Sequence, residues 1–170
     1  MNKSALSLLI ALLLSALCFP AVAPAAQELD PANLQTLDDA GLKRILQNEG
    51  KGKIVIVTFF ASWCGPCRKE IPQLVRLRSK VPEEDMLILG VNFDHSLEDL
   101  NRFLRRVKMN FPVYIGESNV FTSKNKLIEI RAIPRMFIYD AAGSQVQDIE
   151  GVLPEAVFDR MVDYLLESAI

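Results

Sequence analysis

Cys64 and Cys67 are the residues of this sequence whose type and spacing most clearly allow chemistry. Two cysteines separated by two residues can hold half of a zinc ion's ligands, cross-link the chain, or alternate between a dithiol and a disulfide. The pair lies in the segment TFFASWCGPCRKEIPQL at positions 58–74, directly after a run of β-branched and aromatic residues. Each of the three interpretations makes different demands on the rest of the chain.

The zinc and cross-link interpretations find little support. A structural zinc site needs four ligands, usually Cys and His, whereas the chain beyond residue 26 has two cysteines and one histidine, His95. A disulfide stabilises a fold mainly by closing a long loop, and this pair encloses two residues. The pattern therefore favours a redox pair, and we expect neither a metal nor another cofactor.

The positions around the pair suit redox chemistry. Cys64 follows a predicted strand and begins a predicted helix, so its sulfur can accept hydrogen bonds from first-turn amides, including that of Cys67. The positive end of the helix dipole favours the thiolate form of Cys64. Pro66 suits the first turn because N–H groups there have no acceptor within the helix, so a proline loses no hydrogen bond. Cys67, one turn further on, is predicted to be less exposed and to resolve a mixed disulfide.

The segments that must position the pair alternate between strand and helix patterns. The continuous apolar runs at 54–60 and 86–93 predict strands buried on both faces. The other predicted elements are helices at 36–46, 64–80, 96–107 and 153–170, a short strand or extended edge at 111–115, a short helix at 120–130, and a β-hairpin of strands 135–140 and 145–151. Pro72 is predicted to kink its helix. This order predicts one α/β domain with a central mixed β-sheet flanked by helices.

The composition and the first residues bear on location. The chain has 170 residues, half of them hydrophobic, and a net charge of −2, with scattered basic residues that exclude a nucleic-acid-binding stripe. Residues 1–25 combine a basic start, an apolar centre and a small-residue cleavage site, which predicts a secretory signal and a domain at 26–170. We therefore expect a periplasmic or otherwise extracytoplasmic protein. The alternative is an uncleaved membrane anchor, although Pro20 and Pro24 interrupt the apolar run.

Two segments carry a family resemblance. FASWCGPC (60–67) resembles the active-site segment of the thioredoxin superfamily, and IEIRAIPRMFIYD (128–140) resembles the segment that presents a cis proline to the dithiol. The resemblance implies a thioredoxin-like fold with a C-terminal hairpin and helix, and a cis bond between Ile133 and Pro134. The extra helix and strand within 91–113, with the leader, make the chain similar to the exported TlpA/ResA/CcmG-like thiol–disulfide oxidoreductases.

That resemblance also implies a function and partners. The subgroup reduces disulfides outside the cytoplasm, often those of apocytochromes c, with electrons from a membrane thiol reductase. We expect a disulfide-bearing exported protein as substrate, such a reductase as electron donor, and a monomeric state. The alternatives are an oxidant or isomerase that donates or shuffles disulfides, and a copper chaperone that uses the two thiols and His95.

Glu70 is the third predicted catalytic residue, besides Cys64 and Cys67. It matches the active-site glutamate of the ResA-like subgroup, whereas Thr58 stands where cytosolic thioredoxins carry a buried Asp. We expect partial burial to raise the pKa of Glu70, so that its carboxylate takes the proton of Cys67. The alternative is an exposed acid that merely complements the helix dipole.

Four further residues are predicted to bind the substrate. Trp63, Ile133 and Pro134 would form an apolar platform for the partner chain. Arg135 departs from the family pattern, because the residue after the cis proline is usually Thr or another small or polar residue. A long cation beside the dithiol would either stabilise the thiolate or select an acidic partner.

Overall fold

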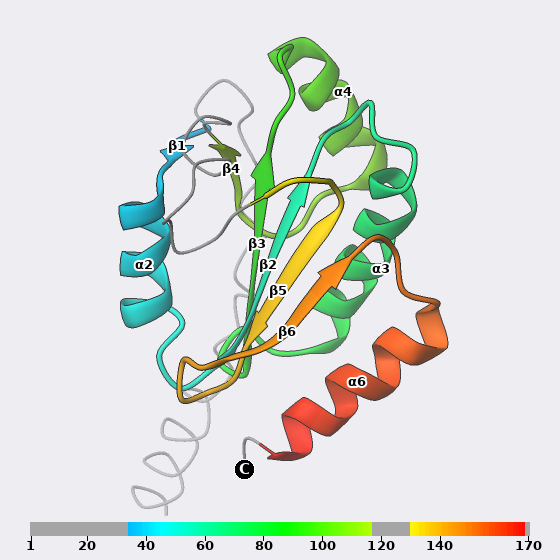
Figure 1. The fold of residues 1–170 in the computed structure, drawn as a ribbon. Helices are drawn as coiled ribbons and strands as arrows, with labels where there is room; N and C mark the ends of the chain where they lie inside the picture. Colours follow the sequence, from blue (N-terminus) through cyan, green and yellow to red (C-terminus); the bar gives the residue numbers. More distant parts are fainter. Residues whose placement is uncertain (1–33, 117–129, 169–170) are drawn as a thin grey trace, which may run out of the picture.

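The structure, a computed structural model, describes residues 34–116 and 130–168. The predicted secretory signal lies outside the described residues, and residue 130 alone of the predicted helix at 120–130 is described. Within the described part, a central sheet has helix α2 on one face and helices α3, α4 and α6 on the other (Figure 1). This is the mixed sheet flanked by helices that the sequence predicts.

The sheet has six strands in the order β1-β4-β3-β2-β5-β6. Their bounds are β1 Thr36–Leu37, β2 Ile54–Phe60, β3 Met86–Asn92, β4 Val113–Gly116, β5 Arg135–Tyr139 and β6 Gln145–Glu150. The pairs β1–β4, β4–β3 and β3–β2 are parallel, while β5 is antiparallel to both β2 and β6. The predicted parallel crossovers and C-terminal hairpin are confirmed.

The helices are α2 Asp39–Asn48, α3 Cys67–Lys80, α4 Leu97–Val107 and α6 Glu155–Ser168. Helix α3 continues through Pro72, because Ile71 and Leu74 on either side of it are buried against the sheet. None of the helices in the described ranges is long and apolar enough to cross a membrane.

The sequence placed two helix starts too early. Asp38 caps α2 by accepting a hydrogen bond from the Gly41 N–H at 2.7 Å, and the residues before it form the short strand β1, which the sequence analysis missed. Helix α3 begins at Cys67, not at Cys64. Pro66 is its N-terminal cap, and Cys64 lies in the preceding turn.

Alternation along β2 divides the core into two clusters. All seven residues of β2 are buried, as predicted for a strand covered on both faces. Ile54, Ile56 and Phe60 pack on the side of α3, α4 and α6, together with both cysteines. Val55, Val57 and Phe59 pack on the side of α2. Because side chains alternate between the faces, Thr58 points to the α3 side, and it is the one polar residue in the strand.

Candidate active site

The two cysteines form a disulfide at the carboxyl end of β2. Cys64 and Cys67 are bonded through their sulfurs, with their Cα atoms 5.3 Å apart. Cys67 is completely buried and Cys64 is 6% exposed, so Cys67 is the less exposed of the two, as predicted. Trp63, immediately before Cys64, is 64% exposed. The disulfide thus sits just under the surface beside a protruding indole.

One backbone donor reaches the Cys64 sulfur, although the helix starts later than predicted. The Cys67 N–H lies 3.2 Å from Cys64 Sγ, and the Arg68 N–H donates to the Cys64 carbonyl oxygen at 3.1 Å. The predicted contact between the Cys67 amide and the Cys64 sulfur is confirmed. After reduction, this N–H group and the positive end of α3 favour negative charge on Cys64.

Glu70 lies in the first turn of α3 and is 1% exposed. The Thr58 hydroxyl donates to Glu70 Oε2 at 2.8 Å, while Oε1 has no hydrogen-bond partner among the described residues. Burial raises the pKa of Glu70 to about 7, and the hydrogen bond from Thr58 opposes part of this rise. The alternative of an exposed acid is therefore wrong, and the predicted burial is more complete than expected.

The positions of Thr58 and Glu70 follow from local geometry. Thr58 faces α3 because side chains alternate along β2. Glu70 follows Cys67 by three residues, so the side chains of Cys67 and Glu70 both lie on the buried face of α3. A carboxyl group that titrates near neutral pH, with one unsatisfied oxygen, can accept or return a proton in this dry environment. The arrangement suits proton exchange with a cysteine of the same face.

A second segment meets the disulfide from far along the chain. The bond between Ile133 and Pro134 is cis, as the family resemblance implies. The Cys64 sulfur lies 3.7 Å from the carbonyl oxygen of Ile133. Pro134 is buried, whereas Ile133 is half-buried and packs against both hydrophobic clusters. The structure thus brings three of the predicted site residues together.

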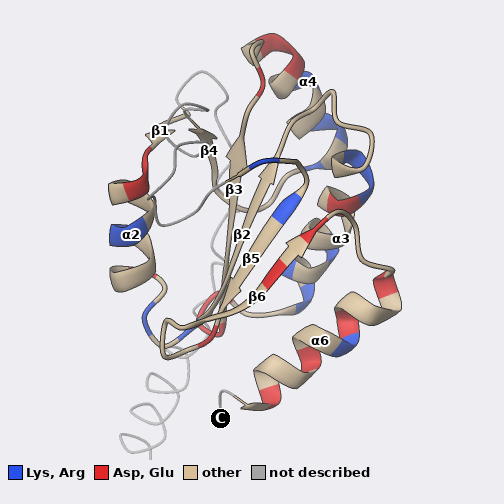
Figure 2. Ribbon diagram, viewed as in Figure 1, with Lys and Arg blue, Asp and Glu red and all other residues tan. Residues whose placement is uncertain are grey.

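Arg135 does not lie beside the dithiol as a free cation. Its guanidinium forms ion pairs with Asp148, at 2.6 Å, and with Glu150 on the neighbouring strand β6. It also lies over the Phe137 ring, 5.7 Å from the centroid, on the sheet face opposite α3. Figure 2 shows this blue start of β5 beside the red residues of β6. The expected position of a cation beside the dithiol is wrong, because alternation along the strand places this side chain on the opposite face of the sheet. The role of Arg135 in substrate binding stays a prediction.

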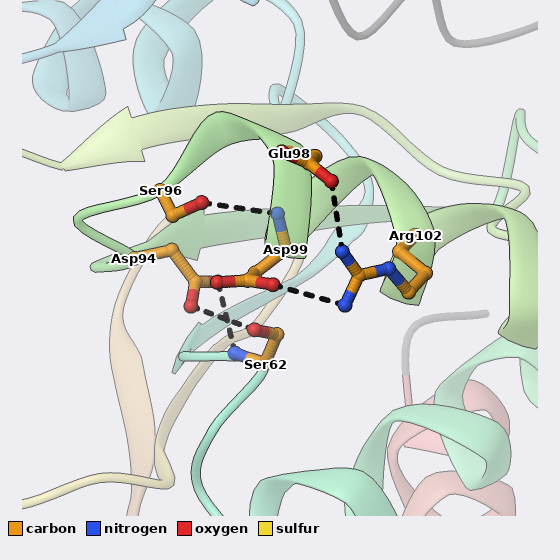
Figure 3. Close-up of polar contacts among 6 residues, drawn as sticks. All are labelled: Ser62, Asp94, Ser96, Glu98, Asp99 and Arg102. Atoms are coloured by element: carbon orange, nitrogen blue, oxygen red, sulfur yellow. Dashed lines mark hydrogen bonds and ion pairs between the residues drawn. The ribbon is translucent and has the colours of Figure 1, made fainter.

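Asp94 is a site-supporting residue that the sequence analysis missed. Its carboxylate accepts hydrogen bonds from the Ser62 N–H at 2.9 Å and from the Ser62 hydroxyl at 2.7 Å (Figure 3). The Asn92 side-chain amide also donates to it at 2.7 Å. Asp94 thereby anchors the loop that carries Cys64. A signal was available, since the carboxyl ends of adjacent parallel strands lie side by side and both loops begin there.

His95 follows Asp94 in the same loop and is exposed. Within residues 34–116 and 130–168, no group of three or more His, Cys, Asp or Glu side chains is arranged to hold a metal ion. The disulfide and the buried carboxyl group of Glu70 can support thiol chemistry and proton transfer.

Comparisons with known proteins agree with this geometry. Residues 28–147 match the AhpC/TSA family. Thiol-disulfide oxidoreductase ResA of Bacillus thuringiensis subsp. konkukian is 28% identical over 123 residues, covering 72% of this chain and 68% of ResA. Thiol:disulfide interchange protein HelX of Rhodobacter capsulatus is 32% identical over 115 residues, covering 68% of this chain and 62% of HelX.

Solved structures give the same result for the fold. The crystal structure of a thiol:disulfide interchange protein of the thioredoxin family from Chlorobium tepidum TLS is similar with a TM-score of 0.61 and 32% sequence identity. The similarity covers 68% of this chain and 81% of that chain. The predicted thioredoxin-like fold is confirmed.

Proposed function

The chain belongs to the AhpC/TSA family and to the ResA-like branch of the thioredoxin superfamily, and on this premise we propose that it reduces disulfides of partner proteins outside the cytoplasm. The branch consists of thiol–disulfide oxidoreductases, and the chain is an oxidoreductase of this kind. One observation carries the proposal. The Cys64–Cys67 disulfide lies at the start of α3, whose buried face holds a carboxyl group with a pKa near neutrality.

The first step consumes the reduced form of the protein. The Cys64 thiolate attacks one sulfur of the substrate disulfide, a bond forms between Cys64 Sγ and that sulfur, and the other substrate sulfur leaves as a thiolate that takes a proton from water. Trp63 and the segment at Ile133 and Pro134 flank Cys64 and provide apolar contact for the partner chain. The product is a mixed disulfide.

The second step resolves the mixed disulfide. Cys67 gives its proton to the Glu70 carboxylate, and the resulting thiolate attacks Cys64 Sγ. The bond between Cys64 and the substrate breaks, and the second substrate sulfur leaves as a thiolate. Two electrons have then passed to the substrate, and the protein holds the Cys64–Cys67 disulfide that the structure shows. A dithiol donor, which we propose to be a membrane thiol reductase, must reduce it again.

The direction of the reaction is tested by the equilibrium reduction potential of the Cys64–Cys67 pair, measured against glutathione or dithiothreitol buffers. We expect a value near that of thioredoxin, about −270 mV. A value near that of strong oxidants, about −120 mV, contradicts the reductase proposal and assigns the protein to disulfide donation.

Export and the substrate class need separate tests. We propose that residues 1–25 direct export and that apocytochromes c are among the substrates, because the leader pattern and the family resemblance both support this. Cell fractionation with N-terminal sequencing of the purified protein tests export. A protein that stays in the cytoplasm contradicts it. Reduction of a disulfide within a haem-attachment Cys-X-X-Cys-His peptide tests the substrate class.

A further inference from the structure

A pocket of about 320 Å³ opens next to the active-site loop, and the proposed thiol chemistry does not use it. Besides Ser62, its walls are formed by Trp63, Arg68, Asp99, Arg102, Phe103 and Arg106. The pocket therefore joins the loop before Cys64, the first turn of α3 and one side of α4. We call it the arginine pocket.

The arginine pocket is basic although the whole chain has a net charge of −2. Three arginines face one aspartate. Arg102 is held by Glu98 at 3.0 Å and by Asp99 at 3.1 Å, as Figure 3 shows. Arg68 and Arg106 form no ion pair with any residue in the described ranges. Two guanidinium groups are thus available to a ligand.

The pocket adjoins the reacting sulfur. Trp63 precedes Cys64 in the chain, and the Arg68 N–H donates to the Cys64 carbonyl oxygen. An extended polypeptide advances about 3.3 Å per residue, so a partner whose cysteine reaches Cys64 places its neighbouring residues near these walls. The exposed indole of Trp63 and the buried ring of Phe103 offer apolar contact, while the guanidinium groups suit carboxylates.

We propose that the arginine pocket binds an acidic segment of the partner polypeptide, within a few residues of the disulfide to be reduced. This inference rests on the proposed function and specifies its substrate class. The charge complementarity selects partners through their Asp and Glu side chains, and it increases the association rate more than the chemical rate at Cys64.

Two synthetic peptides test the proposal. Both contain the same intramolecular disulfide, flanked in one by Asp and Glu and in the other by Asn and Gln. The reduced protein is mixed with each peptide, and oxidation is followed through the fluorescence of Trp63, the single tryptophan of the chain. We expect the acidic peptide to react about tenfold faster at low ionic strength. The ratio should approach one at about 0.5 M salt, where screening is strong.

Matched variants locate the effect. In the double variant Arg68→Gln and Arg106→Gln, the ratio of the two peptide rates should fall to about one. Arg105→Gln is the control, because Arg105 is exposed on the same helix, carries the same charge and does not line the pocket. This variant should keep the wild-type ratio. Comparing two peptides within each variant removes effects of folding or of thiol reactivity.

The outcomes separate the docking proposal from the proposed function. If the wild-type protein reduces neither peptide nor the neutral bis(2-hydroxyethyl) disulfide, the proposed function fails. Equal rates for the two peptides, or a preference that the double variant retains, overturn the docking proposal alone. A third outcome is that the wild type shows no peptide preference but binds phosphatidylglycerol vesicles, and that the double variant loses this binding. This result assigns the pocket to a membrane surface and also overturns the docking proposal.

Discussion

Arg68 and Glu70 lie two residues apart in the first turn of α3, yet they belong to opposite environments. Glu70 is 1% exposed, shares a hydrogen bond with Thr58 and has a pKa raised to about 7. Arg68 is exposed and lines a basic pocket beside Trp63. We therefore expect the inner face of the helix start to govern proton transfer and stability, and the outer face to govern contact with the partner.

The two side chains differ because Glu70 is shielded from water and Arg68 is hydrated. A buried carboxylate loses its hydration, so its charge is costly and its protonation changes near neutral pH. An exposed guanidinium keeps its hydration and its charge, and its attraction to a carboxylate is weak and screened by salt. Substitutions on the inner face should therefore change pH profiles and stability, whereas those on the outer face should change partner selection.

The largest effect is expected at the cysteines, where the two faces meet. Cys67→Ser should lower turnover by on the order of 10³-fold or more, because the mixed disulfide at Cys64 can no longer be resolved. The trapped adduct is detected by mass spectrometry without reductant. The control Cys64→Ser should form no adduct. An adduct at Cys67 in this control would contradict the assigned order of attack.

Glu70→Gln should slow the resolving step by about 100-fold above pH 7, since the amide accepts no proton. In the wild type, this rate should rise with pH through about 7, where the Glu70 carboxyl ionises. The variant should lose that rise. Stopped-flow measurements from about pH 5 to about pH 9 test both effects. Thr58→Val removes the hydrogen-bond donor to Glu70, so the rise in rate should move to higher pH. If Glu70→Gln shows the same pH profile as the wild type, the role of Glu70 is contradicted.

Glu70 should also make stability depend on pH. Its folded-state pKa of about 7 exceeds the ordinary value of 4.5, so the folded state holds the proton more tightly. The stabilisation that comes from the protonated Glu70 is complete below pH 4.5 and is lost as the pH rises to about 7. Above that pH, Glu70 causes no further change in stability. The difference is about 3 kcal/mol, since one pKa unit corresponds to about 1.4 kcal/mol. Urea unfolding of the oxidised protein should show this decline in the wild type and not in Glu70→Gln.

Trp63→Ala tests the outer face. Loss of the exposed indole should lower kcat/KM for peptide disulfides about tenfold, because an aromatic contact with the partner chain disappears. The reduction potential and the pH at which the rate rises should stay the same. Quantification of released thiols measures the rates. Trp63→Phe should recover part of the lost activity. A changed pH profile in Trp63→Ala would contradict the assignment of proton transfer to the inner face alone.

Arg135→Gln should have the smallest effect. Its ion pairs with Asp148 and Glu150 lie on a partly exposed hairpin, so their loss should lower the free energy of unfolding by no more than about 1 kcal/mol. The reduction potential should not change, because the side chain lies on the sheet face opposite α3. A shift above about 30 mV would show that Arg135 acts on the dithiol after all.

Sequence patterns predicted the parts of this protein that depend on neighbouring residues. The buried strands β2 and β3, the hairpin, and the contact between the Cys67 amide and the Cys64 sulfur all follow from local composition and spacing. Strand β1 was missed because two residues carry no periodicity and pair only with β4, far along the chain. The start of α3 was misplaced because Pro66 serves as its cap.

The sequence by itself determined the redox pair, the strand and helix that carry it, and the presence of a carboxyl group one turn beyond Cys67. The tertiary structure alone decided that Glu70 is fully buried against Thr58, that Asp94 anchors Ser62, and that Asp148 and Glu150 engage Arg135. Each of these contacts joins residues on different elements. They depend on strand register and on which face each side chain takes, and both are set by packing across the whole sheet.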